Sequence, residues 1–220
     1  MRVTAAEAWD LIRSGVTVVD TRPLPAFLPA HVPGALPVEF HLADLTDRAA
    51  LLLPPGTAVL VVAEPAATVE ASLGLLEDAG LRVHGHLAGG VAAWAAAGRP
   101  LCALPTLTVR ELHAQAAAHR VLDVREPFEF KHGHLTGACL LPSGEAWAAV
   151  PALARAGEGG PSPAPAAPDA DRRPFAVFCS GSGRAAFVAA LLQREGAAAR
   201  LVLGGMYAWQ GAGLPVVRGA

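Results

Sequence analysis

Cysteine, lysine and tyrosine are scarce in this chain of 220 residues. The three cysteines, Cys102, Cys139 and Cys179, form no Cys-x-x-Cys pair. An odd number without such pairs argues against a disulfide scaffold and a zinc site, so we predict a cytoplasmic protein without a metal. No apolar run reaches the roughly 18 residues of a membrane span, and the first residues lack the apolar core of a signal peptide.

Charge is also sparse. Only 16% of the residues are charged and the net charge is −2, so the chain has no basic field for nucleic acid. Hydrophobic residues make up 53% of the chain, which is enough for packed cores. A chain of this length suits two domains of about 100 residues each.

The sequence repeats itself. An Asp-x-Arg motif follows an apolar run at Asp20 and again at Asp123, and each is followed at equal spacing by His-x-x-Gly-Ala. A Gly-Gly pair and a tryptophan then close each copy. The spacing between the copies grows before the second Gly-Gly pair, so the second copy contains an insertion, which we place at 156–173, where Pro, Ala and Gly dominate. We therefore predict two domains, 1–103 and 104–220, with a disordered stretch over 157–171.

Helix and strand patterns alternate within each copy. Short continuous apolar runs such as Val59–Val62 are typical of parallel strands buried on both faces. This alternation predicts an α/β fold in which each copy is a parallel β-sheet with helices on both faces. Thr4 and Thr108 each stand three residues before a glutamate, which is the spacing of a helical capping box. In the first copy we expect helices at 5–14, 42–51, 67–79 and 91–97, and strands at 17–20, 58–63 and 83–86.

Cys179 is the strongest candidate for chemistry. It ends the apolar run Phe175–Phe178 and is followed by the loop Ser180, Gly181, Ser182, Gly183 and Arg184, and then by a helical stretch over 185–195. Ligands of a parallel sheet bind beyond the carboxyl ends of its strands. A cysteine after an apolar strand is, taken alone, more often a core residue, but the loop that follows favours catalysis.

The loop predicts an anion site around that sulfur. Backbone N–H groups of a small-residue loop converge on an anion, and the start of a helix adds partial positive charge. A free thiol has a pKa of about 8.5, and we expect this environment to lower it enough to make thiolate the main form at neutral pH. Arg184 adds a guanidinium suited to anion oxygens.

These segments together resemble the rhodanese (sulfurtransferase) family in its tandem form. The resemblance covers nearly all of both halves and is carried by residues 123–130, 133–138, 179–184, 204–205 and Trp209. Each motif alone is a modest signal, but their order and their repetition make the set specific. The resemblance implies two rhodanese-like domains, a persulfide enzyme and no metal or organic cofactor.

The implied reaction is a two-step sulfur relay. The Cys179 thiolate attacks the outer sulfur of a small anionic donor such as thiosulfate, sulfite leaves, and the persulfide passes its sulfur to cyanide or a thiol. The N–H groups of residues 180–184 would hold the negative sulfur, and Arg184 would orient the donor. The amino-acid sequence of the loop leaves 3-mercaptopyruvate open as an alternative donor. A protein thiol stays open as the acceptor.

The first copy lacks this site. The repeat places Ala63 opposite Cys179 and Thr68 opposite Arg184, and Glu64 would repel an anion. The resemblance therefore implies an inactive first domain and a catalytic second one.

The other recurring residues are predicted to be structural. Asp20 and Arg22 persist in the copy without a site, so Asp123 and Arg125 are expected to brace the loop that covers the strand ends. His31 and His134 recur likewise and are expected in turns. We expect packing roles for Cys102, Cys139, Trp94 and Trp209.

Two other functions stay open. Related folds include phosphatases and arsenate reductases with a Cys-x5-Arg loop, whereas four residues separate Cys179 from Arg184 here. A non-catalytic sulfur carrier or binding protein is the second alternative, because the scaffold persists in a copy without the site.

Overall fold

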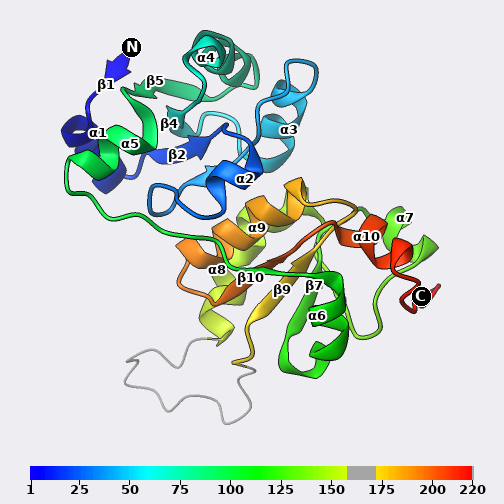
Figure 1. Cartoon of the computed structure of the whole chain (residues 1–220). Helices are drawn as coiled ribbons and strands as arrows, with labels where there is room; N and C mark the ends of the chain where they lie inside the picture. Colours follow the sequence, from blue (N-terminus) through cyan, green and yellow to red (C-terminus); the bar gives the residue numbers. More distant parts are fainter. Residues whose placement is uncertain (158–171, 220) are drawn as a thin grey trace. The chain divides into compact units, whose positions relative to one another are not determined.

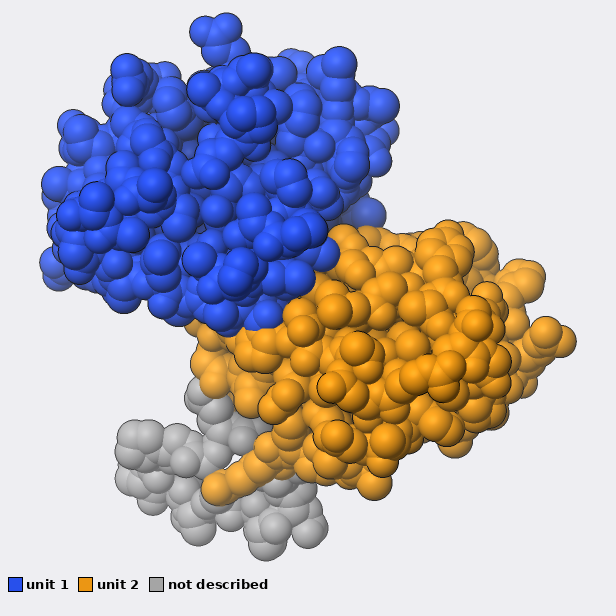
Figure 2. Space-filling model, viewed as in Figure 1, with its two compact units in different colours: residues 1–104 blue, residues 105–220 orange. Residues whose placement is uncertain are grey.

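The computed structural model describes residues 1–157 and 172–219 and divides the chain into two compact units, Met1–Leu104 and Pro105–Ala220 (Figure 1, Figure 2). Each unit holds one five-stranded sheet in which every strand pair is parallel, and helices flank both sheets. The predicted α/β class is confirmed.

Unit 1 has the strand order β1-β5-β4-β2-β3. Its described elements are β1 (Arg2–Val3), α1 (Ala5–Arg13), β2 (Thr17–Asp20), α2 (Leu24–Phe27), β3 (Leu36–Pro37), α3 (Leu45–Leu52), β4 (Ala58–Val62), the 3₁₀ turn η1 (Ala66–Thr68), α4 (Val69–Asp78), β5 (Arg82–Leu87) and α5 (Gly90–Ala96).

Unit 2 repeats this order as β6-β10-β9-β7-β8. Its described elements are β6 (Thr106–Leu107), α6 (Val109–Ala114), η2 (Ala116–Ala118), β7 (Arg120–Asp123), α7 (Pro127–His132), β8 (Cys139–Leu140), η3 (Ser143–Glu145), α8 (Ala146–Gly157), β9 (Phe175–Phe178), α9 (Gly183–Arg194), β10 (Ala199–Val202) and α10 (Gly205–Gly211). The insert was predicted at 156–173. Its first residues belong to the end of α8, and residues 158–171 lie outside the described residues.

Both predicted capping boxes are present. Thr4 caps α1 and Thr108 caps α6, and in each case the glutamate three residues on accepts a hydrogen bond from the backbone N–H of the threonine. These reciprocal bonds satisfy donors that the first turn of a helix leaves free. The two domains therefore start their first α-helix in the same way.

The cores confirm the buried strands and the packing of the tryptophans. β4 and β9 are buried along almost their whole length, which fits central strands covered on both faces. Trp94 and Trp209 are buried, and each donates its indole N–H to a backbone carbonyl. Among the described residues no helix is long and apolar enough to cross a membrane.

Candidate active site

Cys179 lies directly beyond the carboxyl end of β9, the central strand of the sheet in unit 2. The neighbouring strands β7 and β10 run parallel to it, so the loop after β9 opens at the edge where such sheets bind ligands. All four residues of β9 are buried, and this packing fixes the position of the strand end from which the loop begins. The sequence placed the cysteine at this strand end, and the structure agrees.

The loop after Cys179 is held by the start of α10. The N–H groups of Met206 and Tyr207 donate to the carbonyl oxygens of Cys179 and Ser180 at 2.8 and 3.0 Å. Gly205 has a φ of +51°, and a Cβ there would collide with the carbonyl oxygens of Cys179 and Gly181. Glycine is therefore required at this position, because both the backbone angle and the close approach exclude a side chain.

The sulfur of Cys179 is buried, with only 2% of the residue exposed. The loop does point amides at it, because the N–H groups of Ala185 and Gly181 act on the sulfur. Burial nevertheless raises the pKa of the Cys179 thiol, and the lowering effects of Ala185, Arg184 and Gly181 do not outweigh it. The expectation of a resting thiolate is therefore wrong. Removal of the sulfur from water destabilises the thiolate more than these groups stabilise it.

Arg184 does not stand free to meet an anion. Its two terminal nitrogens donate to the two carboxylate oxygens of Glu129 at 2.7 and 2.9 Å. Ser180 joins the cluster, since its hydroxyl donates to Glu129 and accepts from Arg184. Partial burial alone would raise the pKa of Glu129, but hydrogen bonds from Arg184 and Ser180 outweigh it and lower that pKa to about 2. Glu129 is thus ionised at neutral pH.

Sequence reasoning did not single out Glu129. It belongs to α7, a helix of six residues that was not predicted. A usable signal was present, because Glu126 and Glu129 have capping-box spacing around Pro127, and the structure forms that box. Ala185 was missed as well, because its contribution comes from a backbone N–H and not from its side chain.

Asp123 and Arg125 form a buried ion pair beneath the loop after β7. The Arg125 Nη2 atom lies 2.6 Å from Asp123 Oδ2 and donates to the carbonyl oxygen of Gly133 at 2.8 Å. Asp20 and Arg22 form the same pair in unit 1, with a matching bond to a backbone carbonyl. These contacts join the end of one strand to the turn that leads to the next.

The histidines of the repeated turn are held in the same way in both units. The rings of His31 and His134 stack on Phe27 and Phe130, with ring centroids 3.9 and 3.7 Å apart. Each Nδ1 atom also lies within hydrogen-bond distance of the carbonyl oxygen four residues earlier. The structure therefore gives both histidines a local packing role. Among residues 1–157 and 172–219, no three His, Cys, Asp or Glu side chains gather as a metal site.

The corresponding place in unit 1 is an open cavity of about 970 Å³ beside α4, lined by residues that include Ala63, Glu64, Glu70 and His86. The N–H of Val91 donates to the Glu64 carboxylate at 3.3 Å. In unit 2 the equivalent amide, that of Met206, binds the carbonyl of Cys179. A carboxylate has therefore taken a place that the loop backbone holds in unit 2.

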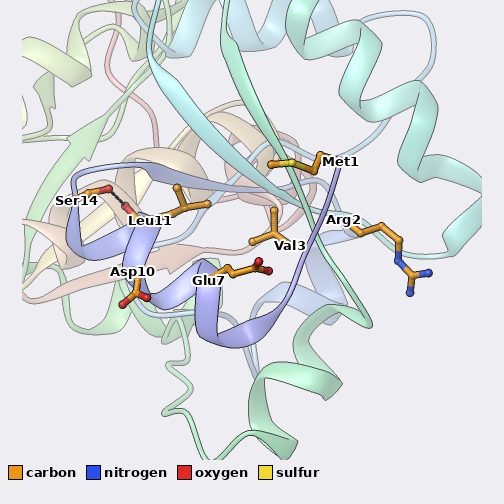
Figure 3. A pocket seen from close by; sticks show the side chains of 7 residues that line it. All are labelled: Met1, Arg2, Val3, Glu7, Asp10, Leu11 and Ser14. Atoms are coloured by element: carbon orange, nitrogen blue, oxygen red, sulfur yellow. Dashed lines mark hydrogen bonds between the residues drawn. The ribbon is translucent and has the colours of Figure 1, made fainter.

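A smaller cavity of about 400 Å³ lies in unit 1 between β1 and α1 (Figure 3). Its charged side chains are Arg2, Glu7 and Asp10, and Glu7 is already bound in the capping box of α1. No thiol lines this cavity, so it adds nothing to the candidate site.

The other two cysteines correct an expectation. Cys102 and Cys139 were expected to pack in the interior, but both are exposed. Cys139 lies in β8, a two-residue strand at the edge of its sheet, and Cys102 meets His31 only through a backbone bridge. The apolar neighbours of Cys139 in the sequence were therefore not sufficient to predict its burial, although Leu36, at the equivalent edge position of unit 1, is buried.

Comparison with known families decides the relationship. The model of the rhodanese-like domain matches the chain twice, at residues 4–97 and 108–212. The chain belongs to the rhodanese-like family. Both rhodanese-like domains carry the five-stranded sheet described above. No curated protein gives a significant match.

Several solved structures are similar. A rhodanese-related protein from Thermoplasma volcanium is 27% identical, with 51% of this chain and 97% of that chain covered and a TM-score of 0.42. A thiosulfate sulfurtransferase from Pseudomonas aeruginosa is 19% identical over 100% of this chain, with a TM-score of 0.40, and this chain covers only 44% of it. A protein of unknown function from Rhodopseudomonas palustris, described as a possible tyrosine phosphatase, is 26% identical, with 52% and 85% covered and a TM-score of 0.40.

Proposed function

We propose that this rhodanese-like protein is a sulfurtransferase in which Cys179 carries a sulfane sulfur from a small donor to a thiol or cyanide. The observation that carries the proposal is the sulfur at the end of β9, with the N–H groups of Gly181 and Ala185 directed at it. A sulfur that must hold negative charge twice, first as thiolate and then as persulfide, needs donors of this kind in a site that excludes water.

The chemistry begins from the thiol. The proton of Cys179 passes to solvent in a minor equilibrium, and the resulting thiolate attacks the outer sulfur of thiosulfate. The S–S bond of the donor breaks with its electron pair on sulfite, and the new bond gives the Cys179 persulfide anion. Attack by cyanide on the outer sulfur then releases thiocyanate and restores the thiolate.

The catalytic unit in this proposal is the second domain, and the first domain supplies no nucleophile. Ala63 replaces the cysteine there, and a carboxylate faces the amide of Val91. We assign substrate binding to the loop residues Ser180, Gly181, Ser182, Gly183 and Arg184, of which Arg184 has its guanidinium paired with Glu129. Asp123 and Arg125 brace the neighbouring loop.

The test is direct detection of the sulfur adduct. The protein is incubated with thiosulfate, with 3-mercaptopyruvate and with an organic persulfide, and peptide mapping by mass spectrometry locates any gained sulfur atom. We expect one added sulfur on Cys179, and thiocyanate release after cyanide is added. Cys179→Ser should lose both signals, whereas the matched variant Cys139→Ser should keep them.

Two results would overturn the proposal. Absence of an adduct with all three donors would favour a non-catalytic binding protein. Hydrolysis of an aryl phosphate that disappears in Cys179→Ser would favour the phosphatase alternative.

A further inference from the structure

The Glu129 carboxylate binds the guanidinium of Arg184, the group that the candidate site would use to bind an anion. Both terminal nitrogens of Arg184 bind its carboxylate, and the hydroxyl of Ser180 bridges the pair. The side chains of Arg184 and Glu129 are 27% and 19% exposed, so water screens this contact only in part. A bidentate pair of this kind is strong and fixed in direction.

The pair of Glu129 and Arg184 carries no net charge of its own. The pKa of Glu129 is held near 2, so its negative charge cancels the positive charge of Arg184 at neutral pH. The buried pair of Asp123 and Arg125 is likewise balanced. The Cys179 thiol itself is uncharged at rest, because burial raises its pKa. Amide dipoles at the sulfur are thus the main attraction for a donor.

The two copies within the chain separate Glu129 from the structural residues. Unit 1 keeps the Asp20–Arg22 pair of the fold. It has Ala26 where unit 2 has Glu129, and Thr68 where unit 2 has Arg184. The carboxylate and the guanidinium are therefore absent from the same copy, the one that also lacks the cysteine. Glu126, the other half of the α7 capping box, is replaced there as well, by Pro23, so Glu129 belongs both to that cap and to the group of residues that accompany the cysteine.

We propose that Glu129 sets the donor preference of the site by cancelling the charge of Arg184, so that a doubly charged donor such as thiosulfate is disfavoured against an organic persulfide. This inference rests on the proposed sulfurtransferase function. In the favoured reaction the Cys179 thiolate attacks the outer sulfur of R–S–SH, the S–S bond breaks, and the electron pair leaves on R–S⁻, which takes up a proton. Cys179 keeps the transferred sulfur as its persulfide.

The first experiment measures donor preference in Glu129→Gln. This change keeps the size of the side chain and its hydrogen-bonding oxygen but frees the charge of Arg184. We expect kcat/KM for thiosulfate to rise on the order of tenfold, because a dianion gains from one uncancelled cation in a poorly screened site. The value for the persulfide of 2-mercaptoethanol should change by less than about threefold, and the thiosulfate rate should become more sensitive to salt.

Glu195→Gln is the matched control. It removes one negative charge from the C-terminal end of α9, where the Glu195 carboxylate accepts a hydrogen bond from Arg194 and is not among the groups that act on Arg184. Its donor ratio should stay within about twofold of the wild type. An equal rise in both variants would show that only the overall charge matters and would overturn the proposal.

A second experiment reads the local charge without any enzyme activity. In a background with the exposed cysteines replaced, Cys102→Ser and Cys139→Ser, Cys179 is alkylated with anionic iodoacetate and with neutral iodoacetamide. The ratio of the two rates cancels changes in the acidity and exposure of the thiol. It should rise several-fold in Glu129→Gln and fall in Arg184→Gln, which leaves the carboxylate unbalanced. The double variant should return to the wild-type ratio.

These readings separate the two proposals. If the wild type forms no adduct with any donor, the proposed function fails, but the alkylation ratio still reports whether Glu129 controls charge at the sulfur. An unchanged ratio in a folded Glu129→Gln protein would refute the role of Glu129 while leaving sulfur transfer intact. If Glu129→Gln does not fold, an unchanged ratio in Arg184→Gln would refute it equally.

Discussion

At the scale of the residue, opposing influences set the acidity of Cys179. Burial at the end of β9 raises the pKa of its thiol, while the N–H groups of Ala185 and Gly181 and the charge of Arg184 lower it. Because burial is the larger effect, the folded protein holds the proton more tightly than the unfolded chain does. The sulfur is therefore mainly a thiol at rest. It reacts through its small thiolate fraction, which the equilibrium replenishes as the thiolate is consumed.

This balance predicts a pH dependence for the reaction of Cys179. Its alkylation by iodoacetamide should rise about tenfold per pH unit and keep rising above pH 8.5, the ordinary pKa region of a thiol. In urea-unfolded protein the rise should level off near that region. The raised pKa also stabilises the fold below about pH 8.5 and loses that effect as pH rises through the folded pKa. A plateau near neutral pH in the folded protein would contradict this account.

The sequence could reveal the nucleophile but not its protonation state. Cys179 follows a buried strand and precedes a glycine-containing loop, and both features can be predicted from the amino-acid sequence. The pKa depends on how far the fold removes the sulfur from water, which no local pattern records. The partner of Arg184 was hidden for a similar reason, because Glu129 lies 55 positions away and is brought to it by the sheet.

At the scale of the element, α10 acts as a template for the loop after β9. Gly205 permits its first turn to lie against the carbonyl oxygens of the loop, and Met206 and Tyr207 donate to those oxygens. Close packing of backbone on backbone thus explains Gly205, whereas a Cβ at the equivalent Gly90 in unit 1 would meet the Glu64 side chain. The short elements β8 and α7 were not predicted, because two to six residues give too little periodicity to read.

Gly205→Ala should disrupt this template. The added methyl group meets backbone atoms, which cannot turn aside as a flexible side chain would, so we expect a loss of about 1–3 kcal/mol in the free energy of unfolding. Persulfide formation on Cys179 should fall by more than the unfolded fraction explains, because the loop amides shift. Urea unfolding and peptide mapping measure the two effects.

Gly211→Ala is the control for that change. It lies in the same helix, and a Cβ there meets nothing within 4 Å. This variant should be neutral or slightly more stable, since alanine favours a helix over glycine by roughly 0.5–1 kcal/mol. Equal behaviour of the two variants would mean that the close approach of α10 does not shape the loop.

At the scale of the whole molecule, two domains of the same fold carry different residues at the carboxyl edge of the sheet. The two domains share strand order, capping boxes and the buried Asp–Arg pair. They differ at the carboxyl edge of the sheet, where unit 1 has a carboxylate against the amide of Val91 and a cavity lined by Glu64 and Glu70. The repeat in the sequence was sufficient to predict two similar α/β domains with a capping box at the start of each, but it predicted neither the strand order nor the short elements α7 and β8.

A thiol alone should not convert unit 1 into a second site. Ala63→Cys in a Cys179→Ser background should give no persulfide with thiosulfate, because Glu64 adds negative charge and the place of Arg184 holds Thr68. Peptide mapping after incubation with the donor checks this, with the wild type as the positive control. Sulfur found on the introduced thiol would show that the surrounding residues matter less than proposed.

The unequal exposure of the three cysteines governs how the protein responds to air. Cys102 and Cys139 face solvent, whereas Cys179 is shielded inside its loop. Oxidants therefore reach the two surface sulfurs first, and chains joined by a disulfide in storage will be linked through them. Such covalent dimers can keep an intact sulfur at position 179, so a band of double size on a non-reducing gel is no measure of an inactivated protein.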